Sequence, residues 1–230
     1  MKIKQTILFL FFIFVYSTCF TQTLFQVSCY QALYNGKLDG IISMQELIKH
    51  GDTGIGGFNA LNGEMILIDG KMFQILSSGK VISNPDLSDK TPFASVCFFK
   101  SQKQVNIIGD SSLYKITDRL ADNPDVFVAI KITGTFEYIK TRSVPAQKKP
   151  YPSLSEIVKT QPIFEKTKVK GTIVGFRTPQ FAAGINPPGY HLHFVADDAS
   201  MGGHVLEVHP SNVTCEIMIV DEVFLKLSVN

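Results

Sequence analysis

The sequence predicts an α/β protein of the α+β kind in two domains: an N-terminal mixed β-sheet with helices, and a C-terminal domain of mostly antiparallel β-structure. Helix-like and strand-like segments alternate up to about residue 140, whereas most segments after residue 165 are short apolar runs with strand character. The stretch between them, "RSVPAQKKPYP", has the prolines and lysines typical of a linker. We therefore expect domains at residues 23–150 and 151–230.

Residues 1–22 are predicted to be a secretory signal peptide. Two lysines precede an unbroken apolar run from Ile7 to Tyr16, and small residues follow where a peptidase could cut. The run is too short to span a bilayer comfortably. Lipid attachment at Cys19 is disfavoured because Tyr16 stands where a leucine is expected. We therefore expect a secreted or periplasmic protein with no membrane association after cleavage.

Composition excludes several classes of function. The formal net charge is +2, which provides no strong attraction to nucleic acid. Apolar residues make up 45% and charged residues 18% of the chain, as in ordinary globular proteins. Removing the predicted signal leaves Cys29, Cys97 and Cys215. Three cysteines allow at most one disulfide within the chain, so the protein is no disulfide-stabilised scaffold.

The elements of the N-terminal domain follow from local patterns. A first strand is expected in "LFQVSCYQAL", and a helix in "SMQELIKHG", where Ser43 and Glu46 form a capping box. "EMILIDGKMFQIL" alternates about an Asp69–Gly70 turn and predicts a hairpin. A strand in "TPFASVCFFK", a helix in "SSLYKITDRLADNPD" and a long β-segment at 126–140 complete the domain.

The C-terminal domain begins with a second capping-box pattern, at Ser153 and Glu156 of "SLSEIVKT". Five strands are then expected in quick succession, which favours an antiparallel sandwich or barrel. They are "KVKGTIVGF", "YHLHFVAD", "HVLEV", "CEIMIVD" and "VFLKLSV".

Three of the five histidines lie in one stretch, "GYHLHFVADDASMGGHV". His191 and His193 are two residues apart, so in a strand they project from the same face. If the turn centres between residues 198 and 199, His193 lies directly across from His204, with Cβ atoms ~4.5–5.5 Å apart. Three imidazoles on one face can bind one metal ion and leave a coordination position open, which is the catalytic pattern for Zn²⁺.

The same histidines could instead be ordinary polar residues of an exposed strand, and the spacing alone does not name the metal among Zn, Cu, Fe and Ni. The two remaining histidines are not expected to be ligands. His209 is five residues from His204 and therefore on the opposite face of a regular strand. His50 ends a predicted helix, where it can interact with the helix dipole.

Three separated segments resemble one known family, the acetolactate decarboxylases. "GFRTPQFAAGINPPGYHLHFVADDASMGGHVLE" is similar to the signature region of that family. "HGDTGIGGFNALNGEMILIDG" resembles its N-terminal motif and "RSVPAQKKPY" its central arginine motif. The order and spacing of the three agree, and the resemblance spans residues 24–230.

The resemblance implies a zinc-dependent lyase that decarboxylates 2-acetolactate to acetoin and CO2. It implies two α/β domains, with the metal on the C-terminal β-domain, the active site between the domains, and a homodimer. It further implies that His191, His193 and His204 bind Zn²⁺, that Glu64 is an active-site carboxylate and that Arg142 is the catalytic arginine.

The sequence departs from the family pattern in two places. Gly57 stands where the family usually has threonine. The family pattern also brings a second acidic residue to the site from a C-terminal tail, and Glu207, Glu216 and Glu222 do not match it by motif.

Two other functions remain open at this stage. A cupin-like metal enzyme would use the same histidines, but that class commonly adds a glutamate a few residues after H-x-H, where this chain has Asp197 and Asp198. An exported metal- or ligand-binding β-protein that diverged from the enzyme is the alternative without catalysis. Turnover of acetolactate distinguishes the three.

Overall fold

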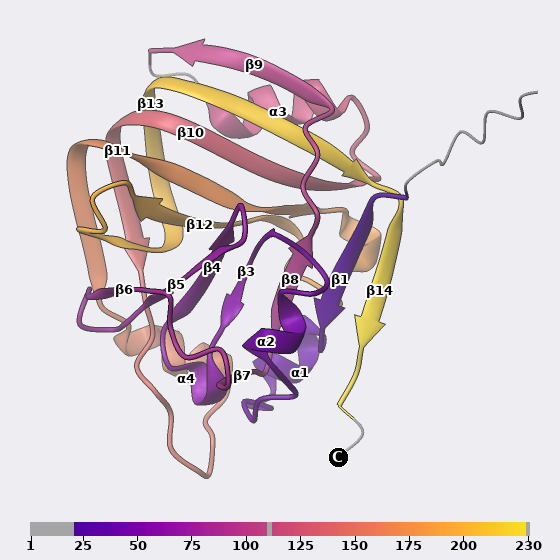
Figure 1. Cartoon of the computed structure of the whole chain (residues 1–230), viewed down its shortest axis with the longest axis vertical. Helices are drawn as coiled ribbons and strands as arrows, with labels where there is room; N and C mark the ends of the chain where they lie inside the picture. The colour runs from indigo at the N-terminus through magenta and orange to yellow at the C-terminus, as the bar shows by residue number, and fades with distance from the viewer. Residues whose placement is uncertain (1–20, 110–111, 229–230) are drawn as a thin grey trace, which may run out of the picture.

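The computed structural model describes residues 21–109 and 112–228, and strands dominate its architecture (Figure 1). Nearly all of the predicted signal peptide, including Cys19, lies outside these residues. Within the described ranges, no helix combines the length and apolar character needed to cross a bilayer.

The first sheet has seven strands in the described part of the chain, in the order β14-β1-β8-β3-β4-β5-β6. It is mixed, because β1 and β14 pair in parallel while the other pairs are antiparallel. The predicted hairpin is confirmed: its turn residues Asp69 and Gly70 both have positive φ, as a two-residue loop of type I′ requires. The strands are β1 (Thr23–Val27), β3 (Thr53–Gly57), β4 (Glu64–Ile68), β5 (Lys71–Ile75), β6 (Val81–Ser83), β8 (Ala94–Cys97) and β14 (Glu222–Lys226).

The helices are short. They are α1 (Tyr30–Tyr34), α2 (Met44–Leu47), α3 (Leu113–Ala121) and α4 (Leu154–Ile157), with 3-10 turns at Asn59–Leu61, Val158–Thr160 and Gln180–Ala182. A two-stranded ribbon joins β2 (Ile42–Ser43) to β7 (Lys90–Thr91). At α2 the predicted cap is confirmed, since the Ser43 hydroxyl accepts a hydrogen bond from the Glu46 amide. At α4 that prediction was wrong: Ser153 makes no side-chain cap, and its hydroxyl lies 2.8 Å from that of Ser155.

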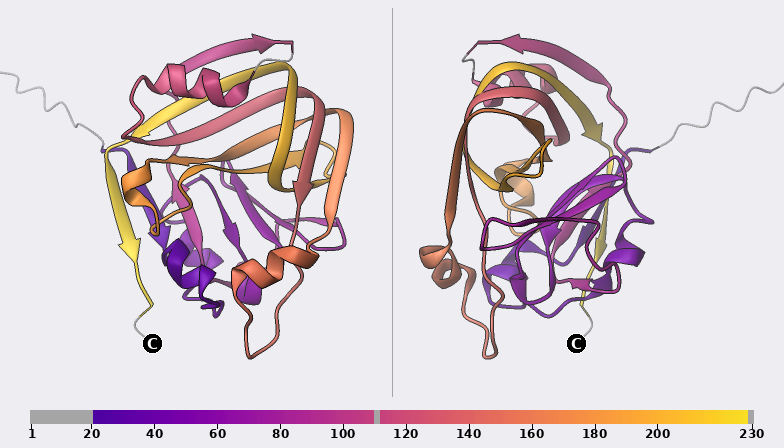
Figure 2. Two further views of the ribbon diagram at one scale, coloured as in Figure 1. Left: turned by 180° about the vertical axis from the view of Figure 1, so that it is seen from behind. Right: turned by 60° about the vertical axis from the view of Figure 1, so that its left-hand side comes forward.

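The second sheet is built from long, curved antiparallel strands. They are β9 (Lys103–Ile108), β10 (Phe127–Arg142), β11 (Ile163–Thr178), β12 (Gly189–Ala196) and β13 (Gly202–Val220). β10 pairs with β11, β11 with β12, β12 with β13, and β13 again with β10, so four strands close into a ring. The strands curl accordingly in the right-hand view of Figure 2. β9 extends this ring by pairing with the second half of β13.

The structure corrects the prediction of separate strands in "HVLEV" and "CEIMIVD". Both belong to β13, which runs through Pro210 without a break. The register between β10 and β13 shifts next to Pro210, and a proline is tolerated in a sheet at such irregularities.

"VFLKLSV" also lies elsewhere than expected. Residues 223–226 of this segment belong to β14, which leaves the second sheet and pairs in parallel with β1 at the edge of the first (Figure 1). The expected boundary at Tyr151 does not coincide with the division between the sheets, because β9 and β10 precede it and pair with β13. Hydrogen bonding follows the available strand edges rather than the order of the chain.

Apolar side chains pack in two main layers around the second sheet. One cluster fills the ring under α3 and includes Ile132, Phe136 and Phe194, none of them exposed. The other lies between the sheets, where Ile66 of β4 meets Val174 of β11. The candidate site lies in this contact between the sheets.

Candidate metal centre

A single hairpin carries the three clustered histidines. His191 and His193 lie on β12 and His204 lies on β13, and His193 is the register partner of His204, as the spacing predicts. The intervening Leu192 and Phe194 point the opposite way, into the apolar interior of the ring. Because strand residues alternate faces, burying these two residues directs the histidines toward the first sheet.

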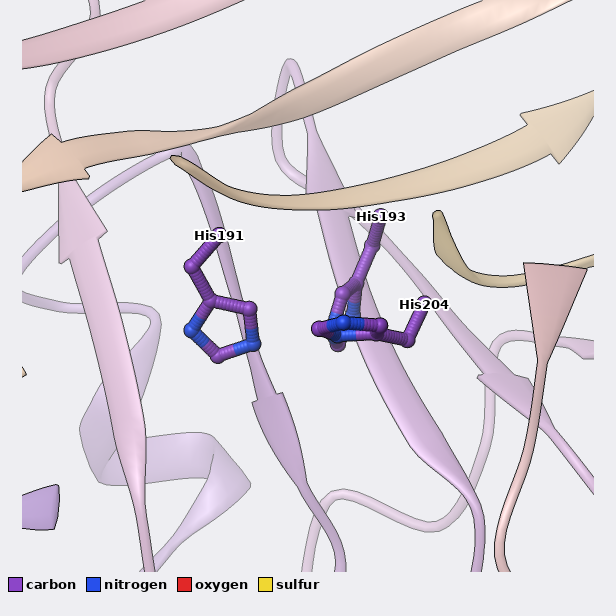
Figure 3. Close-up of side chains that lie close together, drawn as sticks. All are labelled: His191, His193 and His204. Carbon is purple, nitrogen blue, oxygen red and sulfur yellow. The ribbon is translucent and has the colours of Figure 1, made fainter. Parts of the chain in front are cut away.

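The three rings converge (Figure 3). Their centroids are 5.2 Å apart for His191 and His193, 5.0 Å for His191 and His204, and 5.4 Å for His193 and His204. One nitrogen from each ring lies within 4.8 Å of the other two. The predicted cluster is therefore present as a potential three-nitrogen metal site.

The protein favours neutral imidazoles at this cluster. Burial, followed by the positive charge of Arg142, lowers the pKa of His191 to about 4. Burial, followed by the neighbouring histidines, holds the pKa of His193 and of His204 well below the usual value. A metal ion binds the neutral ring, so this environment suits a ligand set.

The ring of His193 is oriented by the first sheet. Its Nδ1 lies 2.9 Å from the carbonyl oxygen of Met65 on β4. A carbonyl can only accept, so Nδ1 carries the hydrogen and Nε2 presents a lone pair. That Nε2 is buried and has no hydrogen-bond partner among the described residues. A buried imidazole nitrogen that has a lone pair and no hydrogen-bond partner is suited to bind a metal ion.

Glu64 approaches the histidines from the first residue of β4. Its Oε2 lies 3.5 Å from Nε2 of His193, and only 14% of its side chain is exposed. Burial, partly opposed by the positive charge of Arg142, raises the pKa of Glu64 from 4.5 to about 7. A carboxyl group that titrates near neutral pH can both give and take a proton.

Arg142 ends β10 as the register partner of His204. Burial lowers the pKa of its guanidinium below the ordinary value, while Glu64 and then Tyr30 oppose that shift. Its Nε is buried and makes no hydrogen bond to any described residue. The backbones of β10 and β13 approach closely here, and this depends on Gly203 of β13. Gly203 has φ +127°, and a Cβ at this position would lie 2.3 Å from the Arg142 carbonyl oxygen.

A cavity of about 220 Å³ connects these groups. Glu64, Arg142, His191 and His204 all line it, so the structure brings together the predicted catalytic residues and two of the three histidines, with His193 buried behind Glu64. Sequence reasoning missed three further polar residues of the lining, Tyr30, Gln161 and Tyr190. The rest of the wall is mainly apolar: Leu33, Leu61, Phe93, Val144, Leu154 and Val158.

The histidines that were not expected to be ligands lie away from the cluster. His50 stacks on Phe25, and His209 pairs with Glu207 at 3.0 Å on the exposed side of β13. None of the three glutamates considered as a second acidic group, Glu207, Glu216 or Glu222, is among the described residues that line the cavity.

Comparison with known proteins decides the family. The model of the Alpha-acetolactate decarboxylase family matches residues 24–230.

The chain belongs to this family.

Named relatives agree with the family match. The chain is 42% identical over 207 residues to the alpha-acetolactate decarboxylase of Brevibacillus brevis, across 89% of this chain and 72% of that one. It is 43% identical over 192 residues to that of Methanosarcina mazei, across 82% and 66%. The structure of alpha-acetolactate decarboxylase from Bacillus subtilis strain 168 matches with a TM-score of 0.87 and 37% identity, covering 90% of each chain. All five candidate residues of this alpha-acetolactate decarboxylase family member lie within the matched segment.

Proposed function

We propose that this chain is an acetolactate decarboxylase that uses Zn²⁺, bound by His191, His193 and His204, to convert 2-acetolactate into acetoin and CO2. The observation that carries the proposal is the convergence of three neutral imidazoles beside Glu64 and Arg142. Three neutral ligands preserve the charge of the ion and leave room for substrate oxygens. When bound, zinc would supply Lewis-acid stabilisation of the negative charge that develops as CO2 leaves.

The reaction requires a place for an electron pair. The bond between the carboxylate carbon and the central carbon breaks, and its electrons move toward the ketone oxygen to form an enediolate. Arg142 supplies a permanent positive charge at the cavity wall, where it can orient the departing carboxylate or stabilise the enediolate. The free Nε of its buried guanidinium provides a donor for such an oxygen.

The enediolate must then take up one proton on carbon to become acetoin. Glu64 is the proton carrier in this proposal, because its raised pKa keeps the acid form available near neutral pH. The apolar part of the wall excludes water and accommodates the two methyl groups of the substrate.

The test is acetoin formation from racemic acetolactate by the purified mature chain. The expected result is activity that a chelator abolishes and added zinc restores, well above the spontaneous decarboxylation of the substrate. His204→Ala should be inactive, whereas His209→Ala serves as the matched control because His209 lies outside the cavity. A zinc-loaded protein that forms no acetoin above background would overturn the proposal and favour a diverged binding protein.

We also propose that the chain is exported after cleavage near residue 22 and that it forms a homodimer. The basic, then apolar, N-terminal sequence supports export. The family resemblance supports the dimer. N-terminal sequencing of the exported protein tests the first proposal, and an uncleaved N-terminus would contradict it. Light scattering during size-exclusion chromatography tests the second, and a monomeric mass would contradict that.

A further inference from the structure

Three uncharged polar side chains lie buried beside the metal centre. Gln26 of β1, Ser95 of β8 and Asn186, in the segment that precedes β12, are all 0% exposed. Gln26 and Ser95 are register partners, so their side chains share one face of the first sheet. Asn186 reaches them across the contact between the sheets. Buried polar groups are costly unless they satisfy one another, so their arrangement is tightly constrained.

The hydrogen bonds among these three side chains have a single consistent assignment of donors and acceptors. Gln26 donates from Nε2 to two backbone carbonyls, those of Val27 at 3.3 Å and Ser28 at 3.1 Å. Its Oε1 must therefore face the other two side chains as an acceptor. The Ser95 hydroxyl donates to it at 2.6 Å, and Nδ2 of Asn186 donates to it at 3.0 Å. Nδ2 also donates to the Ser95 hydroxyl at 2.7 Å.

This pattern determines which way the Asn186 amide points. Both hydrogens of its Nδ2 are used by Gln26 and Ser95, so Oδ1 faces the other way, 3.5 Å from Nδ1 of His191. An amide oxygen can only accept. If Nδ1 lacked a hydrogen, two lone pairs would face each other. The arrangement therefore favours the His191 tautomer with hydrogen on Nδ1 and a lone pair on Nε2, as the Met65 carbonyl does for His193.

We propose that Asn186 is a positioning residue that holds the tautomer and ring orientation of His191, and that Gln26 and Ser95 hold Asn186. The zinc-binding consequence rests on the proposed function, whereas the tautomer itself does not. Partners of this kind on metal-bound histidines raise metal affinity by orienting the ring. The inference also connects the metal centre to the first sheet, because two of the three supporting side chains belong to it.

The tautomer can be measured on the unaltered, metal-free protein. Nitrogen-15 NMR of the labelled chain at pH 8 distinguishes the two neutral tautomers, and His191→Gln assigns the His191 signal. The expected result is hydrogen on Nδ1 of His191. Hydrogen on Nε2 of His191 in the unaltered protein would overturn the proposal. An inactive enzyme that shows the expected tautomer would contradict the proposed function and leave this inference standing.

Metal affinity provides the second readout. Asn186→Leu removes the acceptor and should weaken Zn²⁺ binding by about 10- to 100-fold in a competition with a chelator. Asn186→Asp keeps an oxygen beside His191 and should recover part of that loss. The matched control is Thr117→Val, which removes a buried hydroxyl bonded to the Leu113 carbonyl in α3. Unchanged affinity in Asn186→Leu, or an equal loss in the control, would overturn the proposal.

If Asn186→Leu fails to fold, Ser95→Ala takes its place. It retains Asn186 and removes one of the two acceptors that hold its amide. The expected result is a smaller loss of Zn²⁺ affinity and a mixture of His191 tautomers. Wild-type values for both would overturn the proposed role of the supporting pair.

Discussion

Replacing Glu64 by glutamine should stabilise the metal-free protein while it removes activity. The carboxyl lies beside His193 with 14% of its side chain exposed, and its pKa is raised from 4.5 to about 7 by burial. In the native state the proton is therefore retained between these two pH values, whereas the unfolded chain releases it. The native protein loses stability as the pH rises from 4.5 to 7, because folding must then either bury a charge or hold a proton.

The size of the effect follows from the pKa. At 1.36 kcal/mol per pH unit, the rise from 4.5 to about 7 corresponds to about 3 kcal/mol of native-state stability lost above pH 7. Glutamine has a similar shape and does not titrate. Glu64→Gln should therefore match the wild type near pH 4.5 and exceed its free energy of unfolding by about 3 kcal/mol at pH 8.

Guanidinium chloride unfolding followed by circular dichroism, at several pH values with a chelator present, measures this difference. Glu222→Gln is the matched control, because Glu222 also begins a strand but is exposed. A gain in stability that does not vary with pH, or a variant less stable than wild type at pH 8, would refute the reasoning. With zinc present, the same variant should lose about 10²- to 10⁴-fold in acetoin formation, because its proton carrier is gone.

Three further predictions concern Arg142, Gly203 and His191. Arg142→Lys should lower the rate of acetoin formation at least ~100-fold, because a lysine does not reproduce the planar donor set, while calorimetry should show unchanged zinc affinity. Gly203→Ala should destabilise the protein by about 2 kcal/mol or more in denaturant unfolding, since its Cβ would lie 2.3 Å from a carbonyl oxygen. Gly184→Ala, also at positive φ but with open space around it, should cost less; an equal loss would contradict the clash. As the pH falls from 6.5 to 4, His191 alone should lower the free energy of unfolding of the metal-free protein by about 3 kcal/mol. The reason is that the unfolded chain takes up a proton at this histidine, whereas the native state, in which its pKa is about 4, does not. His191→Gln should remove that part of the acid sensitivity in the same unfolding assay, and an unchanged acid profile would contradict it.

Short-range features of the site could be predicted from the sequence. The two-residue period of a strand and the turn near residue 198 were enough to place His193 opposite His204. The Asp69–Gly70 turn likewise predicted the hairpin that begins with Glu64. In both cases the geometry is set within about a dozen residues, so the local pattern contains the information.

Other parts of the site depend on contacts between distant segments. The strand pairing of β14 with β1 joins residues about 200 apart, and no local pattern indicates which sheet edge is free. Gln26, Ser95 and Asn186 are ordinary polar residues in the sequence. Their role beside His191 follows only from burial at the contact between the sheets.

The sequence by itself determined which residues this protein brings to its chemistry: three histidines in hairpin register, together with Glu64 and Arg142 in motifs that resemble one family. Only the tertiary structure decided their state. The neutral imidazoles, the raised pKa of Glu64 and the orientation of His191 all arise where two sheets exclude water. Desolvation and hydrogen-bond direction depend on everything that surrounds a group, and those surroundings come from segments far apart in the chain.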